Sequence, residues 1–189
     1  MSLHAARAVA PTPLDLTDLT DLTRRVAAEV LAGEHEVHVD PENRWYRRLV
    51  GDDYVDVWLI SWAREKAAEL HDHAGSLGAL TVVSGELLEQ RWVAGTPGRP
   101  AGLRERTLRA GRGATFPLGH VHEVVNTSDT PAISVHAYSP PLTVMSYYAV
   151  EEGPAEQGSR LRRTRSELTR GEPEPLPIVS PSLSGATTA

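Results

Sequence analysis

Histidines recur at one-residue spacing in two separate segments of the sequence. His71 and His73 lie in ELHDH, and His120 and His122 lie in PLGHVH. Side chains alternate between the faces of a β-strand, so His71 and His73 share one face while Asp72 points to the other. Two imidazoles on one face can hold a metal ion if another ligand joins them. The alternative is that these histidines are polar residues at strand ends.

The second histidine segment, GRGATFPLGHVHEVVN, covers residues 111–126. It resembles the second conserved motif of cupins, with matching positions at Gly111, Pro117, Gly119, His122 and Asn126. The resemblance implies that His122 is the metal ligand and that His120 is only its neighbour. It also implies that the Asn126 amide fixes the loop near His122.

The first cupin motif is present in part. His71, His73 and the turn residue Gly85 stand where that motif has them, but Glu65 replaces its leading glycine. Gly78 occupies the position of the usual glutamate ligand. Three neutral imidazoles then remain, and such a metal face keeps positions open for a substrate.

A cupin with this ligand set resembles the cysteine dioxygenase type I family of thiol dioxygenases. That resemblance implies that His71, His73 and His122 are the metal ligands. Mammalian members crosslink a cysteine to the active-site tyrosine, and this chain has Gly78 there and no cysteine at all. Bacterial members commonly carry this glycine, so activity is expected without the crosslink.

The run PAISVHAYSPPL, residues 131–142, resembles the Ser-x-His-x-Tyr segment of the same family. Ser134, His136 and Tyr138 stand at i, i+2 and i+4, which places them on one face of one strand. Three polar groups facing a barrel interior require hydrogen-bond partners. The resemblance implies that they are catalytic, and the alternative is a structural hydrogen-bond ladder.

The family binds the carboxylate of its substrate with an arginine from an early strand, which RWYRRLV, residues 44–50, resembles. Alignment at its Leu-Val end gives this role to Arg47, with Arg48 as the second choice. A guanidinium suits the role because it offers two parallel donors and stays charged.

The resemblance implies an iron(II)-dependent enzyme, with one iron per chain, that adds O2 to the sulfur of L-cysteine and forms cysteine sulfinic acid. The identity of the metal rests on the resemblance alone, because three histidines also bind other divalent metals. The alternatives are a 3-mercaptopropionate or other small-thiol dioxygenase, and a metal-binding cupin without enzymatic activity.

Three segments are expected to position these residues. Residues 14–33 have the apolar spacing of an amphipathic helix, within an N-terminal segment 1–43 that packs on the barrel. Short β-branched and aromatic runs separated by turn residues fill 44–150 and predict an all-β cupin, a double-stranded β-helix or jelly-roll barrel. Residues 151–189 are rich in Pro, Gly and charge and predict an extended tail, with a short helix around 158–170.

Composition limits the remaining possibilities. The chain of 189 residues has a formal charge of -6, so a nucleic acid is not expected as a partner. No apolar run approaches the length of a membrane helix, and the N-terminus has no continuous apolar stretch, which predicts a cytoplasmic protein. We expect a small-molecule thiol as the partner and a monomer as the oligomeric state.

Overall fold

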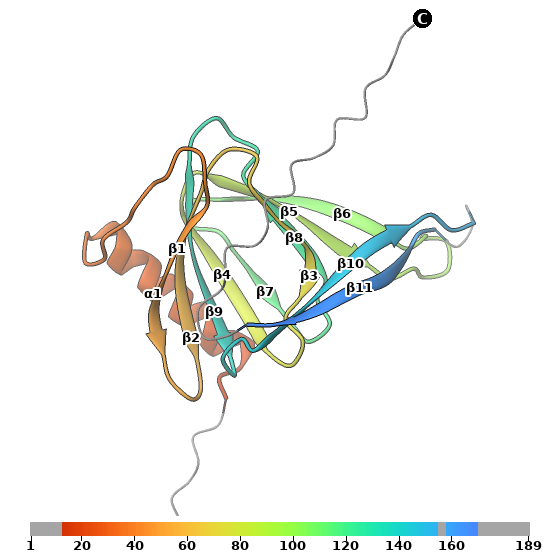
Figure 1. Ribbon diagram of the computed structural model, residues 1–189, viewed down its shortest axis with the longest axis horizontal. Helices are drawn as coiled ribbons and strands as arrows, with labels where there is room; N and C mark the ends of the chain where they lie inside the picture. Colours follow the sequence, from red (N-terminus) through yellow and green to blue (C-terminus); the bar gives the residue numbers. More distant parts are fainter. Residues whose placement is uncertain (1–12, 155–157, 170–189) are drawn as a thin grey trace, which may run out of the picture.

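Two antiparallel sheets face each other in the computed structural model, which describes residues 13–154 and 158–169 (Figure 1). The first sheet has the order β1 (Trp45–Gly51), β2 (Asp56–Trp62), β9 (Ala132–Ser139), β4 (Leu77–Ser84) and β7 (Gly113–Phe116). The second has the order β11 (Arg160–Leu168), β10 (Val144–Glu151), β3 (Ala67–Asp72), β8 (His122–Val125), β5 (Glu86–Val93) and β6 (Gly102–Arg109).

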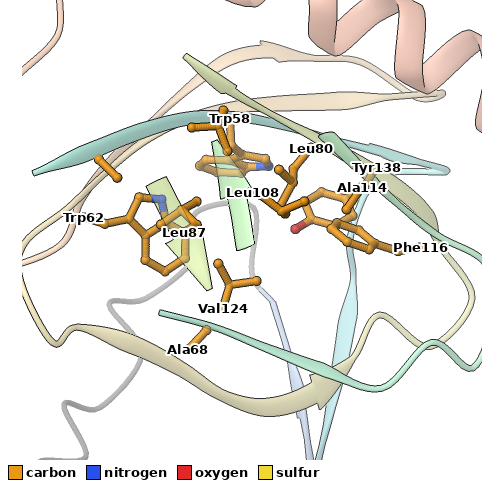
Figure 2. Close-up of a cluster of buried hydrophobic side chains, with 12 residues drawn as sticks. Trp58, Trp62, Ala68, Leu80, Leu87, Leu108, Ala114, Phe116, Val124 and Tyr138 are labelled. Atoms are coloured by element: carbon orange, nitrogen blue, oxygen red, sulfur yellow. The ribbon is translucent and has the colours of Figure 1, made fainter. Parts of the chain in front are cut away.

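Side-chain alternation along the first sheet produces two separate cores. In β2, Trp58 and Trp62 point into the space between the sheets, whereas Val57 and Leu59 point to the outer face. Figure 2 shows the inner cluster, in which residues of both sheets meet in the barrel interior. The strands that carry the predicted site residues line this interior, so their inward side chains are held in a close-packed environment.

The N-terminal helix prediction is confirmed by α1 (Leu16–Leu31), which packs on the outer face of β4 and β9 (Figure 1). Asp15 caps the helix, because its carboxylate accepts hydrogen bonds from the backbone N–H groups of Thr17 and Asp18. Leu19 and Val26 are among its buried residues. The helix therefore supports the sheet from outside and contributes no side chain to the barrel interior.

The helix expected around 158–170 is wrong, because β11 covers most of that segment and pairs antiparallel with β10. Its sequence, RLRRTRSEL, lacks a continuous apolar face, and tertiary contacts stabilise it as an edge strand. Arg165 donates two hydrogen bonds of 2.9 Å to the Glu69 carboxylate on β3 and lies over the Tyr147 ring. The rest of the predicted tail, 155–157 and 170–189, lies outside the described residues.

Two positions of the first histidine motif lie in turns with the left-handed backbone that usually favours glycine. Gly85, between β4 and β5, has φ +73°, as the motif requires. Glu65, where that motif normally has its leading glycine, adopts φ +58° despite its side chain. In the described ranges, no helix has the length and hydropathy needed to cross a membrane.

Candidate metal centre

Three histidines converge between the two central strands of the second sheet. His71 lies near the end of β3, His73 follows that strand, and His122 begins β8. The β3–β8 register places His71 directly opposite His122. All three side chains are buried. The pairing of two short strands thus joins the two histidine segments that are separated by about fifty residues of sequence.

The spacing of the imidazole nitrogens fits one metal ion. Potential ligand atoms of the three histidines all lie within 4.8 Å of one another, and the Nε2 atoms of His71 and His73 are 3.2 Å apart. Two nitrogens that each bind a metal at about 2.1 Å are separated by roughly 3 Å. The donor set therefore suits a divalent cation.

Hydrogen bonds on the far side of two rings orient them toward a common point. Nδ1 of His71 donates to the carbonyl oxygen of Glu69 at 2.6 Å, and Nδ1 of His122 donates to Oε1 of Glu89 at 3.0 Å. Nε2 of His122 is buried and has no hydrogen-bond partner among the described residues. An unpartnered buried nitrogen is costly unless a ligand occupies it, and a metal ion satisfies this requirement.

Burial keeps the three imidazoles neutral. It lowers the pKa of His71 and His73 well below the usual range, and the other histidines nearby lower both further. Burial also lowers the pKa of His122, although Glu89 opposes this shift. A neutral imidazole is the form that binds metal, so protons do not compete with the cation near neutral pH.

Asp72 points away from this cluster, as strand alternation predicts. Its Oδ2 atom accepts a hydrogen bond of 2.6 Å from the Tyr148 hydroxyl on β10, and its Oδ1 atom accepts one from the backbone N–H of Ala74. Asp72 therefore fixes the turn after β3 and does not join the three histidines.

A relay of hydrogen bonds runs along β9 in the barrel interior. The indole N–H of Trp62 donates to Oγ of Ser134 at 2.9 Å, Ser134 is 2.9 Å from Nε2 of His136, and Nδ1 of His136 is 3.3 Å from the Tyr138 hydroxyl. An indole nitrogen can only donate, and among the described residues His136 is the only acceptor near the Ser134 hydroxyl. His136 then donates from Nδ1 to the Tyr138 oxygen, which leaves the Tyr138 proton free for another acceptor.

The relay ends beside the histidine cluster. The Tyr138 ring lies 4.7 Å from the His73 ring, measured between centroids. Burial is the main cause of two further shifts: it lowers the pKa of His136 to about 3, with His122 and Arg44 adding to the effect, and it raises the pKa of Tyr138. A neutral histidine and a protonated tyrosine are the states that the relay needs in order to present a hydrogen-bond donor.

Gly78 makes room for the tyrosine ring. A Cβ at this position would lie 2.8 Å from the Phe116 ring and 2.9 Å from the Tyr138 ring. Both rings lie together in the barrel interior in Figure 2. Glycine is therefore required at position 78 for the Tyr138 ring to pack where it does.

The structure does not bring Arg47 to the histidines. Its side chain is more than half exposed, and its NH1 atom lies 3.9 Å from the Glu36 carboxylate. Arg48 lies over the Trp58 ring, and Arg44, just before β1, lies over the Trp62 ring at 5.1 Å. Residues 44, 46 and 48 thus share the inner side of this segment.

Arg44 is a cation that acts on several residues of the site, and the sequence motifs gave it no role. Burial is the main cause that lowers its pKa, and it interacts electrostatically with Tyr138, Tyr147, His71 and His136. Strand alternation could have indicated Arg44, because it lies two residues before Tyr46 and therefore on the same face. Tyr46 is an aromatic residue packed against the inner core.

Two further positioning residues were also missed. Trp62 donates a hydrogen bond to Ser134 and so anchors the relay. Glu89 on β5 is fully buried and accepts hydrogen bonds from His120, His122 and Arg106. Its signal was a carboxylate at an inward position of the alternating run ELLEQRWV.

Asn126 has the loop-fixing role expected from its motif position. Its side-chain amide donates to the carbonyl oxygens of Trp62 and Thr130, and its Oδ1 atom accepts from Ser128. It therefore ties the end of β8 to the end of β2.

Two facing antiparallel sheets with a histidine cluster between them define a cupin, a double-stranded β-helix protein. The sequence profile described as "Cysteine dioxygenase type I" matches residues 14–150. The chain belongs to the cysteine dioxygenase type I family.

Curated relatives agree with this assignment. Cysteine dioxygenase type 1 from Rattus norvegicus is 33% identical over 105 residues, which are 52% of this chain and 52% of the rat protein. The human protein of the same name is 32% identical over 105 residues, which are again 52% of this chain and 52% of the human protein. The chain thus spans about half the length of these relatives.

Solved structures match this chain in part and at low sequence identity. A Thermus thermophilus protein is 23% identical, covers 56% of this chain and 90% of its own, and has a TM-score of 0.47. A double-stranded β-helix protein of Klebsiella pneumoniae is 20% identical, covers 55% and 78%, and has a TM-score of 0.46.

Proposed function

We propose that this protein is an iron(II)-dependent thiol dioxygenase that converts L-cysteine and O2 to cysteine sulfinic acid. The observation that carries the proposal is the convergence of three neutral, buried imidazoles beside a relay that ends in a tyrosine hydroxyl. Family membership supplies the reaction class. Both oxygen atoms of O2 enter the product, so the reaction requires no external reductant.

His71, His73 and His122 would hold the iron. Bound there, iron(II) would lower the pKa of the substrate thiol and supply the redox chemistry that O2 requires. The three ligands are uncharged, so the negative charges of a thiolate substrate can be accommodated next to the cation. The buried surroundings exclude bulk water and strengthen these electrostatic interactions.

Tyr138 would act as a fixed hydrogen-bond donor to the reacting groups. The relay from Trp62 through Ser134 and His136 occupies the Tyr138 oxygen as an acceptor, which leaves its proton available. A donor held in place before the reaction needs no reorganisation at the moment when charge develops. The three residues on β9 thus act in orientation and hydrogen bonding, and His71, His73 and His122 hold the metal.

The substrate carboxylate would bind to Arg44. Arg44 faces the barrel interior and interacts with Tyr138 and His71, whereas Arg47, the residue that the family resemblance favours, lies outside. A partly desolvated guanidinium gains from a bidentate carboxylate partner. Arg44→Met should therefore raise KM for cysteine by roughly tenfold or more, and Arg47→Met should leave it near the wild-type value. The reverse order would return the role to Arg47.

The function is tested by O2 consumption and sulfinate formation with the iron(II)-loaded protein. Cysteine, 3-mercaptopropionate and cysteamine are supplied in parallel, since they separate the contributions of the amine and the carboxylate. We expect cysteine to be turned over best and cysteamine, which lacks the carboxylate, to react poorly. Preference for 3-mercaptopropionate would identify that thiol, and not cysteine, as the substrate. No O2 uptake with any thiol at full iron occupancy would contradict the dioxygenase proposal and leave a metal-binding cupin.

A further inference from the structure

Glu89 is a buried carboxylate that the proposed reaction does not use. It lies on β5, and its side chain is fully inaccessible to solvent. Across the sheet it stands opposite Arg106 on β6 and Val124 on β8, two residues beyond His122. Glu89 and His122 therefore share the inner face of neighbouring strands at a diagonal position, which long side chains can span.

Both oxygens of Glu89 have partners. Oε1 lies 3.0 Å from Nδ1 of His122 and 3.0 Å from Nε2 of His120, and Oε2 accepts a hydrogen bond from Nε of Arg106. A buried carboxylate is tolerated only with such compensation, because an unpaired charge in this environment is very costly. The network is thus complete within the protein.

The bond to Nδ1 determines which nitrogen of His122 can bind a metal. An ionised carboxylate only accepts, so the His122 proton lies on Nδ1 and the lone pair on Nε2. Nε2 is the atom without a partner among the described residues. A carboxylate behind an imidazole also increases the basicity of the opposite nitrogen, whereas His71 has only a peptide carbonyl in this position.

A second group of donor atoms, from Glu89, His120 and His122, also lies within 4.8 Å of one another and raises the question of a second metal site. The hydrogen bonds speak against it. One carboxylate oxygen already bonds both imidazoles, and the other holds a guanidinium. A cation placed there would face the positive charge of Arg106.

We propose that Glu89, held by Arg106 and His120, is a positioning residue that fixes His122 with Nε2 toward the metal and thereby sets the metal affinity of the three-histidine site. This inference rests on the metal site of the proposed function but not on the thiol oxidation. His120 acts as the second donor that keeps the carboxylate in place.

The test compares Glu89→Gln with Glu86→Gln in the full chain. Glu86 begins the same strand, but its carboxylate is partly exposed and pairs with Arg109. Affinity for Co(II) is measured by competition with a chelator, without thiol or O2. We expect Glu89→Gln to weaken Co(II) binding about 10- to 100-fold and Glu86→Gln to leave it unchanged. Equal affinities of folded wild type and Glu89→Gln would overturn the proposal.

A measurement on the wild type keeps the proposal testable if Glu89→Gln does not fold. Nitrogen-15 NMR of the metal-free protein reports which ring nitrogen of each histidine is protonated, and the His122 signals are assigned by their loss in His122→Gln. We expect the proton on Nδ1 of His122, and a proton on Nε2 would refute the inference. A protein that binds Co(II) as predicted but oxidises no thiol would disprove the proposed function and leave this inference intact.

Discussion

At the scale of single residues, the direction of the hydrogen bonds assigns the roles. Trp62 can only donate, which orders the bonds through Ser134 and His136 and leaves a free proton on Tyr138. Glu89 can only accept, which orders the bond to His122. In the proposed function, metal binding and substrate activation thus depend on different hydrogen-bond networks on different strands.

Removal of the Tyr138 hydroxyl should separate these two networks. Tyr138→Phe keeps the ring that packs against His73 but removes the donor, so we expect kcat to fall by roughly 10²-fold while the iron content per chain stays at the wild-type value. Steady-state O2 uptake and metal analysis provide the two readouts. Unchanged turnover would show that Tyr138 only packs in the barrel.

The residue scale also shows how far the sequence could predict the site. The spacing of His71, His73 and His122 predicted that they would lie together, and the pairing of β3 with β8 brings both motifs side by side. Arg47 was chosen by alignment, but its side chain lies outside, whereas Arg44 and Arg48 lie over the inner-core rings of Trp62 and Trp58. Glu89 could not be assigned, because its partners come from two other strands.

At the scale of secondary-structure elements, β4 and β9 must pack closely for the site to form. Gly78 on β4 is paired directly with Tyr138 on β9, and a Cβ there would come closer to two rings than real Cβ atoms do. The absence of a side chain is therefore what allows the tyrosine to lie beside His73.

Gly78→Ala should accordingly reduce stability and activity together. Overpacking of a filled core costs about 1–3 kcal/mol, and relief requires that the Tyr138 ring move. Urea unfolding and O2 uptake measure the two effects. Gly33→Ala is not a suitable control, because that glycine has φ +81°, whereas Gly75→Ala meets no atom within 4 Å and should be nearly silent. Equal stability of Gly78→Ala and wild type would contradict this packing account.

The start of β2 gives a prediction about pH. Asp56 is buried, and its Oδ1 atom has no partner among the described residues. Burial raises its pKa above 3.8, although Trp58 and Leu142 oppose the shift. The native state then binds the Asp56 proton more tightly than the unfolded state does. The free energy of unfolding therefore falls as the pH rises from 3.8 through the native pKa of Asp56.

Asp56→Asn should remove that dependence. Asparagine can still accept the hydrogen bond from the Leu142 N–H group, and it does not ionise. We expect the variant to gain stability relative to wild type as the pH rises from about 4 to about 7. Urea unfolding of both proteins at the two pH values checks this. A stability difference that is the same at both values would show that Asp56 does not titrate as we infer.

At the scale of the whole molecule, β11 supports β3, the strand that carries His71. β11 is an edge strand of charged residues, but Arg165 reaches across β10 to Glu69, two residues before His71. The sequence alone suggested a tail there, because the segment has no apolar face. Tertiary contacts, which a sequence does not show, hold this strand in place. The all-β barrel and the N-terminal helix were predictable, since both depend on local apolar periodicity.

Arg165→Gln should therefore weaken the fold from its edge. The variant loses a bidentate ion pair with Glu69 and a cation–π contact of 3.8 Å with Tyr147, which together contribute about 1–2 kcal/mol. Arg160→Gln, which removes a more exposed pair with Glu151, should cost much less stability than Arg165→Gln. Chemical denaturation of both variants gives the comparison, and similar losses would argue against a special role for Arg165.

The most direct test of the central claim is the origin of the oxygen atoms in the product. The iron(II)-loaded protein is supplied with cysteine and oxygen-18 gas, and the product is analysed by mass spectrometry. If the protein is a thiol dioxygenase, the product is cysteine sulfinic acid that carries two oxygen-18 atoms, and it forms at the rate at which O2 is consumed. Cystine as the main product, or sulfinate with oxygen from water, would contradict the account.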